Sequence, residues 1–96
     1  MLFMNTWRAH AGKIHDTYKA FAEMPSGDGV GDGGSQINII GRWHNMASGS
    51  GVVVYETDDP KAMAQWALNW NEVLELTIEP VVDDETAKAI GREKWG

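Results

Sequence analysis

Apolar residues recur along this chain at two different spacings, and each spacing predicts one kind of element. Residues 2–7 form a short, mostly apolar run, which predicts a strand. Across 13–24 the apolar side chains fall at helical spacing, and Pro25 with the glycines behind it ends that helix. Residues 36–45 and 52–57 predict two further strands, joined by a turn that contains two glycines.

A second helix is predicted over 58–70. Asp59 is a suitable N-cap, and Pro60 fits the first helical position because its fixed φ suits the helix and its missing N–H is not needed there. The predicted helix carries one apolar stripe, formed by Met63, Trp66, Ala67 and Trp70. We expect this stripe to belong to the core.

The remaining pattern predicts one more strand and a last helix. Residues 73–82 alternate between apolar side chains and acidic or polar ones, as a half-buried strand does. Residues 83–95 begin with acids and end with bases, which is the arrangement that the helix dipole favours. Gly91 predicts that this last helix is short.

The element order is therefore β-α-β-β-α-β with a C-terminal helix. It predicts an α+β protein of the ferredoxin-like type, with a four-stranded antiparallel sheet and both internal helices on one face. The first and third strands are expected at the centre, and the second and fourth at the edges. A chain of 96 residues has room for one domain, which we place over 1–96.

Strict alternation along 36–45 assigns its side chains to two faces. One face would carry Ile37, Ile39, Gly41 and Trp43, and the other Asn38, Ile40, Arg42 and His44. We expect Trp43 to fill the core against Trp66 or Trp70. The open face of the sheet would then carry Phe3, Asn5, Trp7, Ile40, Arg42, His44, Glu75 and Thr77.

That open face is too apolar for a free surface and too polar for a simple core. The two edge strands also carry little of the charge or proline that discourages pairing with another chain. Both features predict a homodimer in which two open faces meet and close an α/β barrel around a cavity.

Composition and charge exclude several classes of function. The chain has no cysteine, so disulfides, thiolate metal sites and cysteine nucleophiles are excluded. A net charge of −6 without a basic run argues against nucleic acid as a partner. Neither a leader-like N-terminus nor a membrane-spanning apolar stretch is evident, so we expect a soluble, cytoplasmic protein that binds no membrane. Each of the five tryptophans needs burial and a partner for its indole N–H.

Glycine-rich residues 26–35 predict a loop. Two motifs in this loop resemble binding sites but lack the flanking elements or ligands that such sites require. Residues 29–34 match G-x-G-x-x-G, but a helix precedes them and a strand follows, the reverse of a dinucleotide site. Asp28 and Asp32 resemble the start of a calcium loop, yet later ligand positions are apolar. The three histidines lack a zinc-binding spacing. We expect neither a metal nor a cofactor.

Arg42 and His44 are the candidate catalytic residues. They lie about 7 Å apart on one strand face, at two strand rises. Across the predicted dimer seam they would approach Glu75, whose carboxylate would keep His44 basic. Arg42 would hold a ligand carboxylate through two parallel hydrogen bonds. The candidate ligand-binding residues are Asn5, Trp7, Asn38, Glu75 and Thr77. The alternative is that Arg42 and Glu75 form a structural ion pair at the interface.

Residues 1–7 and 39–87 resemble the small bacterial family called domain of unknown function 3303. The most specific part is Gly41-Arg42-Trp43-His44 with the glycine turn that follows it, and Trp70, Leu74, Glu75, Leu76 and the Pro80-Val81-Val82 segment also fit. The resemblance implies a ferredoxin-like, dimeric α/β-barrel protein. It implies no activity.

Three functions remain open. The first is binding of a small aromatic or carboxylate-bearing molecule in the cavity between two sheets. The second is a cofactor-independent enzyme, similar to a monooxygenase or an isomerase, with His44 as general acid or base and Arg42 stabilising negative charge. The third is a structural or regulatory dimer with a filled barrel.

Overall fold

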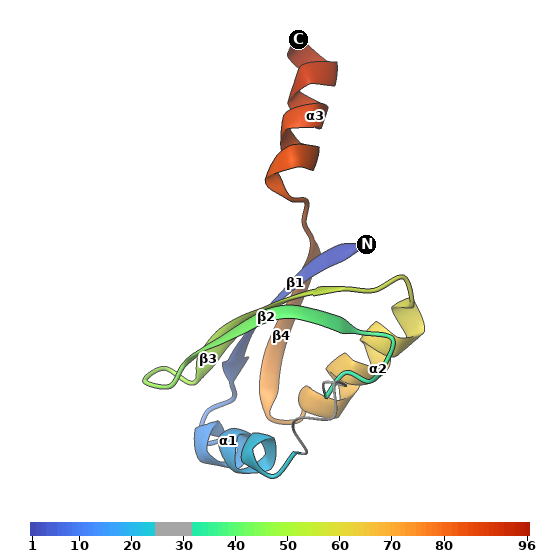
Figure 1. The fold of residues 1–96 in the computed structure, drawn as a ribbon. Coiled ribbons are helices and arrows are strands. Elements are labelled where there is room, and N and C mark those ends of the chain that lie inside the picture. The colour runs from blue at the N-terminus through green and yellow to red at the C-terminus, as the bar shows by residue number, and fades with distance from the viewer. Residues whose placement is uncertain (25–31) are drawn as a thin grey trace.

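The computed structural model describes residues 1–24 and 32–96. Its helices and strands are β1 (Leu2–Ala9), α1 (Ile14–Ala22), β2 (Asn38–Asn45), β3 (Ser50–Glu56), α2 (Pro60–Trp70), β4 (Leu74–Pro80) and α3 (Asp84–Trp95) (Figure 1). The predicted element order is confirmed. The expectation of a short last helix is wrong, because α3 continues through Gly91. Most of the predicted loop, 26–31, lies outside the described residues, and turns follow it up to Ile37.

The four strands form one antiparallel sheet in the order β2-β3-β1-β4. β1 and β3 are central and β2 and β4 are the edges, as predicted. Side chains of α1 and α2 line a common cavity with side chains of the sheet, so both helices cover the same face. The protein has the α+β ferredoxin-like fold, extended by α3.

A β-bulge interrupts the alternation of β2. Ile39 lies opposite Tyr55, and Arg42, three residues later, lies opposite Val53. Because Tyr55 and Val53 are two residues apart on β3, they share a face, and Ile39 and Arg42 therefore share that face as well. The extra residue between Ile39 and Gly41 inverts the pattern from there to the end of the strand.

This inversion overturns two predictions. Trp43 does not fill the core: it lies on the open face and is 61% exposed. Arg42 and His44 point toward the helices instead of away from them. Asn5 and Trp7 also face the helices, while the register with β1 leaves Glu75 and Thr77 on the open face. The expected open face thus mixed residues from both sides of the sheet.

The core lies between the sheet and α2. Tyr55 is fully buried, with the Phe3 ring stacked at 5.8 Å and the Trp66 ring edge-on at 5.0 Å between centroids. Its hydroxyl donates a hydrogen bond of 2.8 Å to the Asn5 Oδ1. The predicted apolar stripe of α2 is confirmed as core, because Trp66 is buried and Met63 and Trp70 pack against the same cluster.

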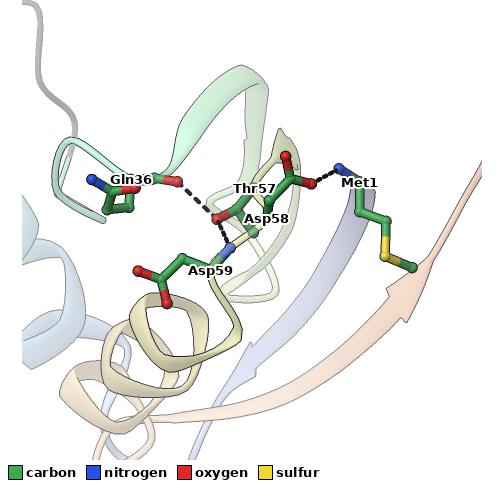
Figure 2. Close-up of polar contacts among 5 residues, drawn as sticks. All are labelled: Met1, Gln36, Thr57, Asp58 and Asp59. Atoms are coloured by element: carbon green, nitrogen blue, oxygen red, sulfur yellow. Dashed lines mark hydrogen bonds and ion pairs between the residues drawn. The ribbon is translucent and has the colours of Figure 1, made fainter.

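Polar contacts fix the start of α2 (Figure 2). Asp59 is the N-cap, and its side chain accepts a hydrogen bond from the Ala62 N–H at 3.1 Å. The buried Thr57 hydroxyl donates to the Gln36 carbonyl at 2.8 Å and accepts from the Asp59 N–H at 3.1 Å. These bonds tie the segment before β2 to the helix that carries Trp66 and Trp70.

α3 projects away from the sheet, beyond the end where β1 begins and β4 ends (Figure 1). None of its residues is buried, and Trp95 is 82% exposed. Among the described residues, no helix has the length and apolar character to cross a membrane.

Candidate functional site

A cavity lies between the covered face of the sheet and helices α1 and α2. It encloses about 50 Å³ and, together with its open mouth, spans about 490 Å³. Its walls are mainly aromatic and aliphatic, with a few polar groups. The residues that supply this polar and aromatic lining are Asn5, Trp7, Thr17, Tyr18, Phe21, Asp32, Arg42, His44, Trp66 and Trp70.

The polar centre of the cavity is the Asp32 carboxylate. Its Oδ1 accepts a hydrogen bond from the Arg42 Nη2, with which it also forms an ion pair. Its Oδ2 accepts from the indole N–H of Trp66 at 2.9 Å and from that of Trp70 at 3.1 Å. One carboxylate thereby accepts the hydrogen bonds of two indole N–H groups and balances the charge of one guanidinium.

These contacts keep Asp32 ionised. Burial by itself would raise the pKa of Asp32, but the hydrogen bonds from Trp66 and Arg42, with the charge of Arg42, hold that pKa below its ordinary value. The Arg42 guanidinium lies 5.2 Å from the Phe21 ring centroid and 5.9 Å from that of Trp66. It therefore gains cation–π attraction in addition to the ion pair.

His44 is an exposed residue, yet its imidazole packs among three aromatic rings. The ring centroids of Trp7, Tyr18 and Phe21 lie 5.5, 5.6 and 5.2 Å from that of His44. The Tyr18 hydroxyl is hydrogen-bonded to the His44 Nδ1 at 3.2 Å. Desolvation, and then the charge of Arg42, lower the pKa of His44 below 6.5, so the imidazole is neutral at pH 7.

We expect His44→Gln to reduce the loss of stability that the protein suffers on mild acidification. Because the pKa of His44 is lower in the folded state than in the unfolded state, unfolding takes up a proton. The contribution of His44 to the free energy of unfolding is therefore fully present above the ordinary pKa of 6.5, and it is lost as the pH falls through the pKa of the folded state. Urea denaturation at about pH 7.5 and about pH 5.5 measures the loss for both proteins. An equal loss in wild type and variant would contradict the lowered pKa.

The wall on the β1 side depends on glycine. A Cβ built on Gly51 would lie 2.3 Å from the Trp7 Cζ2, so the indole rests directly on the glycine backbone. Asn5, next to it on the same face, is only 4% exposed and accepts the Tyr55 hydrogen bond. Trp7 is therefore an aromatic wall, and Asn5 has a structural hydrogen bond as well as a place in the lining.

The structure brings four of the seven predicted site residues together in this cavity: Asn5, Trp7, Arg42 and His44. It does not bring the other three there. Glu75 lies opposite Arg8 on the open face, next to Thr77, whereas Arg42, its predicted partner across a dimer seam, faces the helices. Asn38 is exposed at the start of β2, opposite Glu56.

Asp32, Tyr18 and Phe21 belong to the site but are absent from the predicted set, and Trp66 and Trp70 were expected only to fill the core. One signal pointed to Asp32. Indole N–H groups in a core need acceptors, and Asp32 is one of the two acids within the glycine-rich residues 26–35. In the described ranges, 1–24 and 32–96, no three His, Asp or Glu side chains gather as metal ligands would.

Comparison with known proteins identifies the family. The sequence model described as "Domain of unknown function (DUF3303)" matches residues 1–94. The chain belongs to the DUF3303 family. No curated protein matches this DUF3303 chain. Among solved structures, it is similar to an uncharacterized NIPSNAP domain protein from Burkholderia xenovorans, with 19% identity and a TM-score of 0.47. That match covers 88% of this chain and 97% of the other.

Proposed function

We propose that this DUF3303 protein binds a small, neutral aromatic molecule in the cavity between its sheet and helices α1 and α2. The observation that carries the proposal is a cavity with aromatic walls in which the charge of Arg42 is already balanced by Asp32.

The size and lining of the cavity favour a single ring. Ligand sites are commonly clefts lined by apolar and aromatic groups, as this cavity is. A benzene ring fits a closed cavity of about 150 Å³, which is more than the enclosed part offers here. A ring would therefore occupy the enclosed part and the mouth together.

The charges favour a neutral ligand over a carboxylate. A ligand carboxylate near Arg42 would meet the Asp32 carboxylate, which already holds the guanidinium. Two carboxylates that share one site repel each other, and ionisation of the second becomes costly. A neutral hydroxyl group avoids this cost. It has suitable partners in the neutral imidazole of His44 and the hydroxyl of Tyr18.

Phenol and benzoate, which have the same ring and differ in charge, test this proposal. The indole N–H signals in a ¹⁵N-correlated NMR spectrum serve as reporters. We expect phenol to shift the signals of Trp66 and Trp70 in a saturable way, with benzoate much weaker. Trp43 and Trp95 are exposed and do not line the cavity, so their signals are internal controls.

Glu75→Gln on the open face is the matched control variant, and it should bind phenol as the wild type does. Phenol shifts that are absent, that do not saturate, or that are equally large for Trp43 and Trp95 would refute the proposed site. Stronger binding of benzoate than of phenol would refute the neutral ligand class.

A second candidate function is cofactor-independent catalysis in the same cavity, with His44 as general base. It is favoured by the imidazole of His44, which is hydrogen-bonded to Tyr18 and is neutral, so that it can accept a proton. Phenylacetaldehyde in D₂O is a suitable probe, because abstraction of a proton next to its carbonyl exchanges that proton for deuterium. We expect catalysed exchange by the wild type and loss of exchange with binding retained in His44→Gln. Exchange at the buffer rate would leave binding as the function.

We also infer that two copies associate through their open sheet faces. This face carries a cluster of apolar side chains, Met4, Ile40, Trp43, Val52 and Val54, of which Ile40 and Trp43 are more than half exposed. Contiguous apolar patches of this kind mark interaction surfaces. A 12-residue helix without buried residues is also marginal by itself, which favours a partner for α3.

Analytical ultracentrifugation at micromolar concentration tests this association. We expect a dimer for the wild type and a monomer for Trp43→Glu. Leu68→Glu is the matched control, because Leu68 is 70% exposed on the outer side of α2 and should leave the dimer intact. A monomeric wild type would refute the association, and it would leave the cavity proposal untouched because one chain supplies the whole cavity.

A further inference from the structure

We propose that Arg42, Trp66 and Trp70 form a carboxylate-binding site whose resident occupant is the side chain of Asp32, and that Asp32 thereby sets the charge class of ligand that the cavity accepts. The part concerning ligand charge rests on the proposed function. The carboxylate site itself does not, because it is defined by contacts within the protein.

Three donors converge on one carboxylate from two elements of the fold. β2 supplies the guanidinium of Arg42, and α2 supplies the two indole N–H groups. They divide between the two carboxylate oxygens, with Arg42 on Oδ1 and both indoles on Oδ2. Hydrogen bonds to an ionised acceptor are the strong kind, and the pKa of Asp32 is lowered accordingly.

The donors are held in place by contacts that do not involve Asp32. Trp66 is buried, and its ring packs edge-on against Tyr55 in the core. Trp70 packs against Phe21, with ring centroids 6.3 Å apart, and the Arg42 guanidinium lies over the rings of Phe21 and Trp66. Removal of the Asp32 carboxylate therefore leaves a preformed set of donors.

The occupant, by contrast, comes from outside the sheet and helices. Asp32 lies in the turn segment that precedes β2, and its side chain is 9% exposed. Replacing Asp32 with Ala keeps the Cβ and removes a group that has the atoms of a formate ion. The variant would contain one guanidinium and two indole N–H groups, all at least partly buried, without their acceptor, which is costly.

Chemical rescue with formate tests the carboxylate site. We expect Asp32→Ala to melt below the wild type and sodium formate to raise its melting temperature by several degrees, because a ligand that binds only the folded state stabilises it. Sodium chloride at equal ionic strength and neutral formamide should have little effect. The wild type should not respond to formate, because its site is filled.

Asp32→Asn is the second variant. Its amide fills the space without the charge, so we expect it to be destabilised but not rescued by formate. If Asp32→Ala is unfolded without additions, recovery of the far-ultraviolet circular dichroism signal on adding formate replaces the melting temperature as the readout. Absence of a formate-specific effect on Asp32→Ala, or an equal effect on Asp32→Asn or the wild type, would overturn the inference.

The role of Asp32 in selecting the charge of the ligand is tested by comparing the binding of phenol and of benzoate to Asp32→Ala. The indole NMR signals report the binding. Without Asp32, the guanidinium of Arg42 is unbalanced and should bind benzoate, so we expect the preference to reverse by at least tenfold in favour of benzoate. Formate rescue without this reversal would confirm the carboxylate site and overturn the role of Asp32 in selection. If the wild type binds no phenol, the proposed function fails while the formate result still decides the carboxylate site.

Discussion

Replacing Arg42 with Met lowers the free energy of unfolding by about 3–5 kcal/mol, as loss of one partner from a buried ion pair does. The side chains of Arg42 and Asp32 are only 15% and 9% exposed, so the variant would leave the Asp32 charge largely buried, with the two indole N–H groups as its remaining partners. This is a large part of the roughly 5–15 kcal/mol that stabilises a typical domain. Urea denaturation followed by tryptophan fluorescence measures the loss.

Arg8→Met is the matched control, because Arg8 is exposed on the open face, and this change should cost far less. The double variant Arg42→Met with Asp32→Asn should cost clearly less than the sum of the single changes, since the residues contact each other. Additive costs, or a cost for Arg42→Met no larger than that for Arg8→Met, would show that the ion pair does not stabilise the fold.

Replacing Gly51 with Ala is expected to cost about 1–3 kcal/mol and to displace Trp7 from its place in the cavity wall. The added methyl would lie 2.3 Å from the Trp7 Cζ2 and 2.5 Å from the Trp43 carbonyl oxygen, and the backbone atom cannot yield as a flexible side chain does. Urea denaturation gives the stability, and the Trp7 indole NMR signal reports the displacement.

Gly91→Ala is the matched control for that substitution. Gly91 lies inside α3 with nothing near its added methyl, so the same change there should be neutral or stabilising by about 0.5–1 kcal/mol. A stabilising effect of Gly51→Ala would contradict the contact between Gly51 and Trp7. An unchanged Trp7 signal would contradict the proposed dependence of the cavity wall on this glycine.

The element order and the strand order could be predicted from sequence because each depends on local patterns. Asp59 and Pro60 mark the start of α2, and the alternation over residues 74–79 matches the observed faces of β4. Arg42 and His44 were also predicted to share a face with Asn5 and Trp7, and they do. That grouping survived because Asn5 and Trp7 also lie on the covered face, opposite to their predicted side, and because the bulge in β2 lies before Arg42 and moves Arg42 and His44 together.

The face of the sheet on which Arg42, Trp43 and His44 lie could not be predicted, because a single bulged residue in β2 exchanges the two faces for every residue that follows it. Alternation by two assigns Trp43 to the core only if the strand is regular from Ile37 onward, and a β-bulge leaves no reliable mark in the sequence. The same error led to Glu75 as the partner of Arg42. The actual partner, Asp32, comes from a turn segment whose position depends on tertiary contacts with Trp66 and Trp70.

The most direct test of the central claim locates phenol on the protein by intermolecular nuclear Overhauser effects, which require proton pairs within about 5 Å. The described cavity predicts effects between the phenol ring and the ring protons of Phe21, His44 and Trp70, which line it. Effects confined to Trp43 or Trp95, or none at phenol concentrations that saturate the indole shifts, would contradict a ligand site between the sheet and its helices.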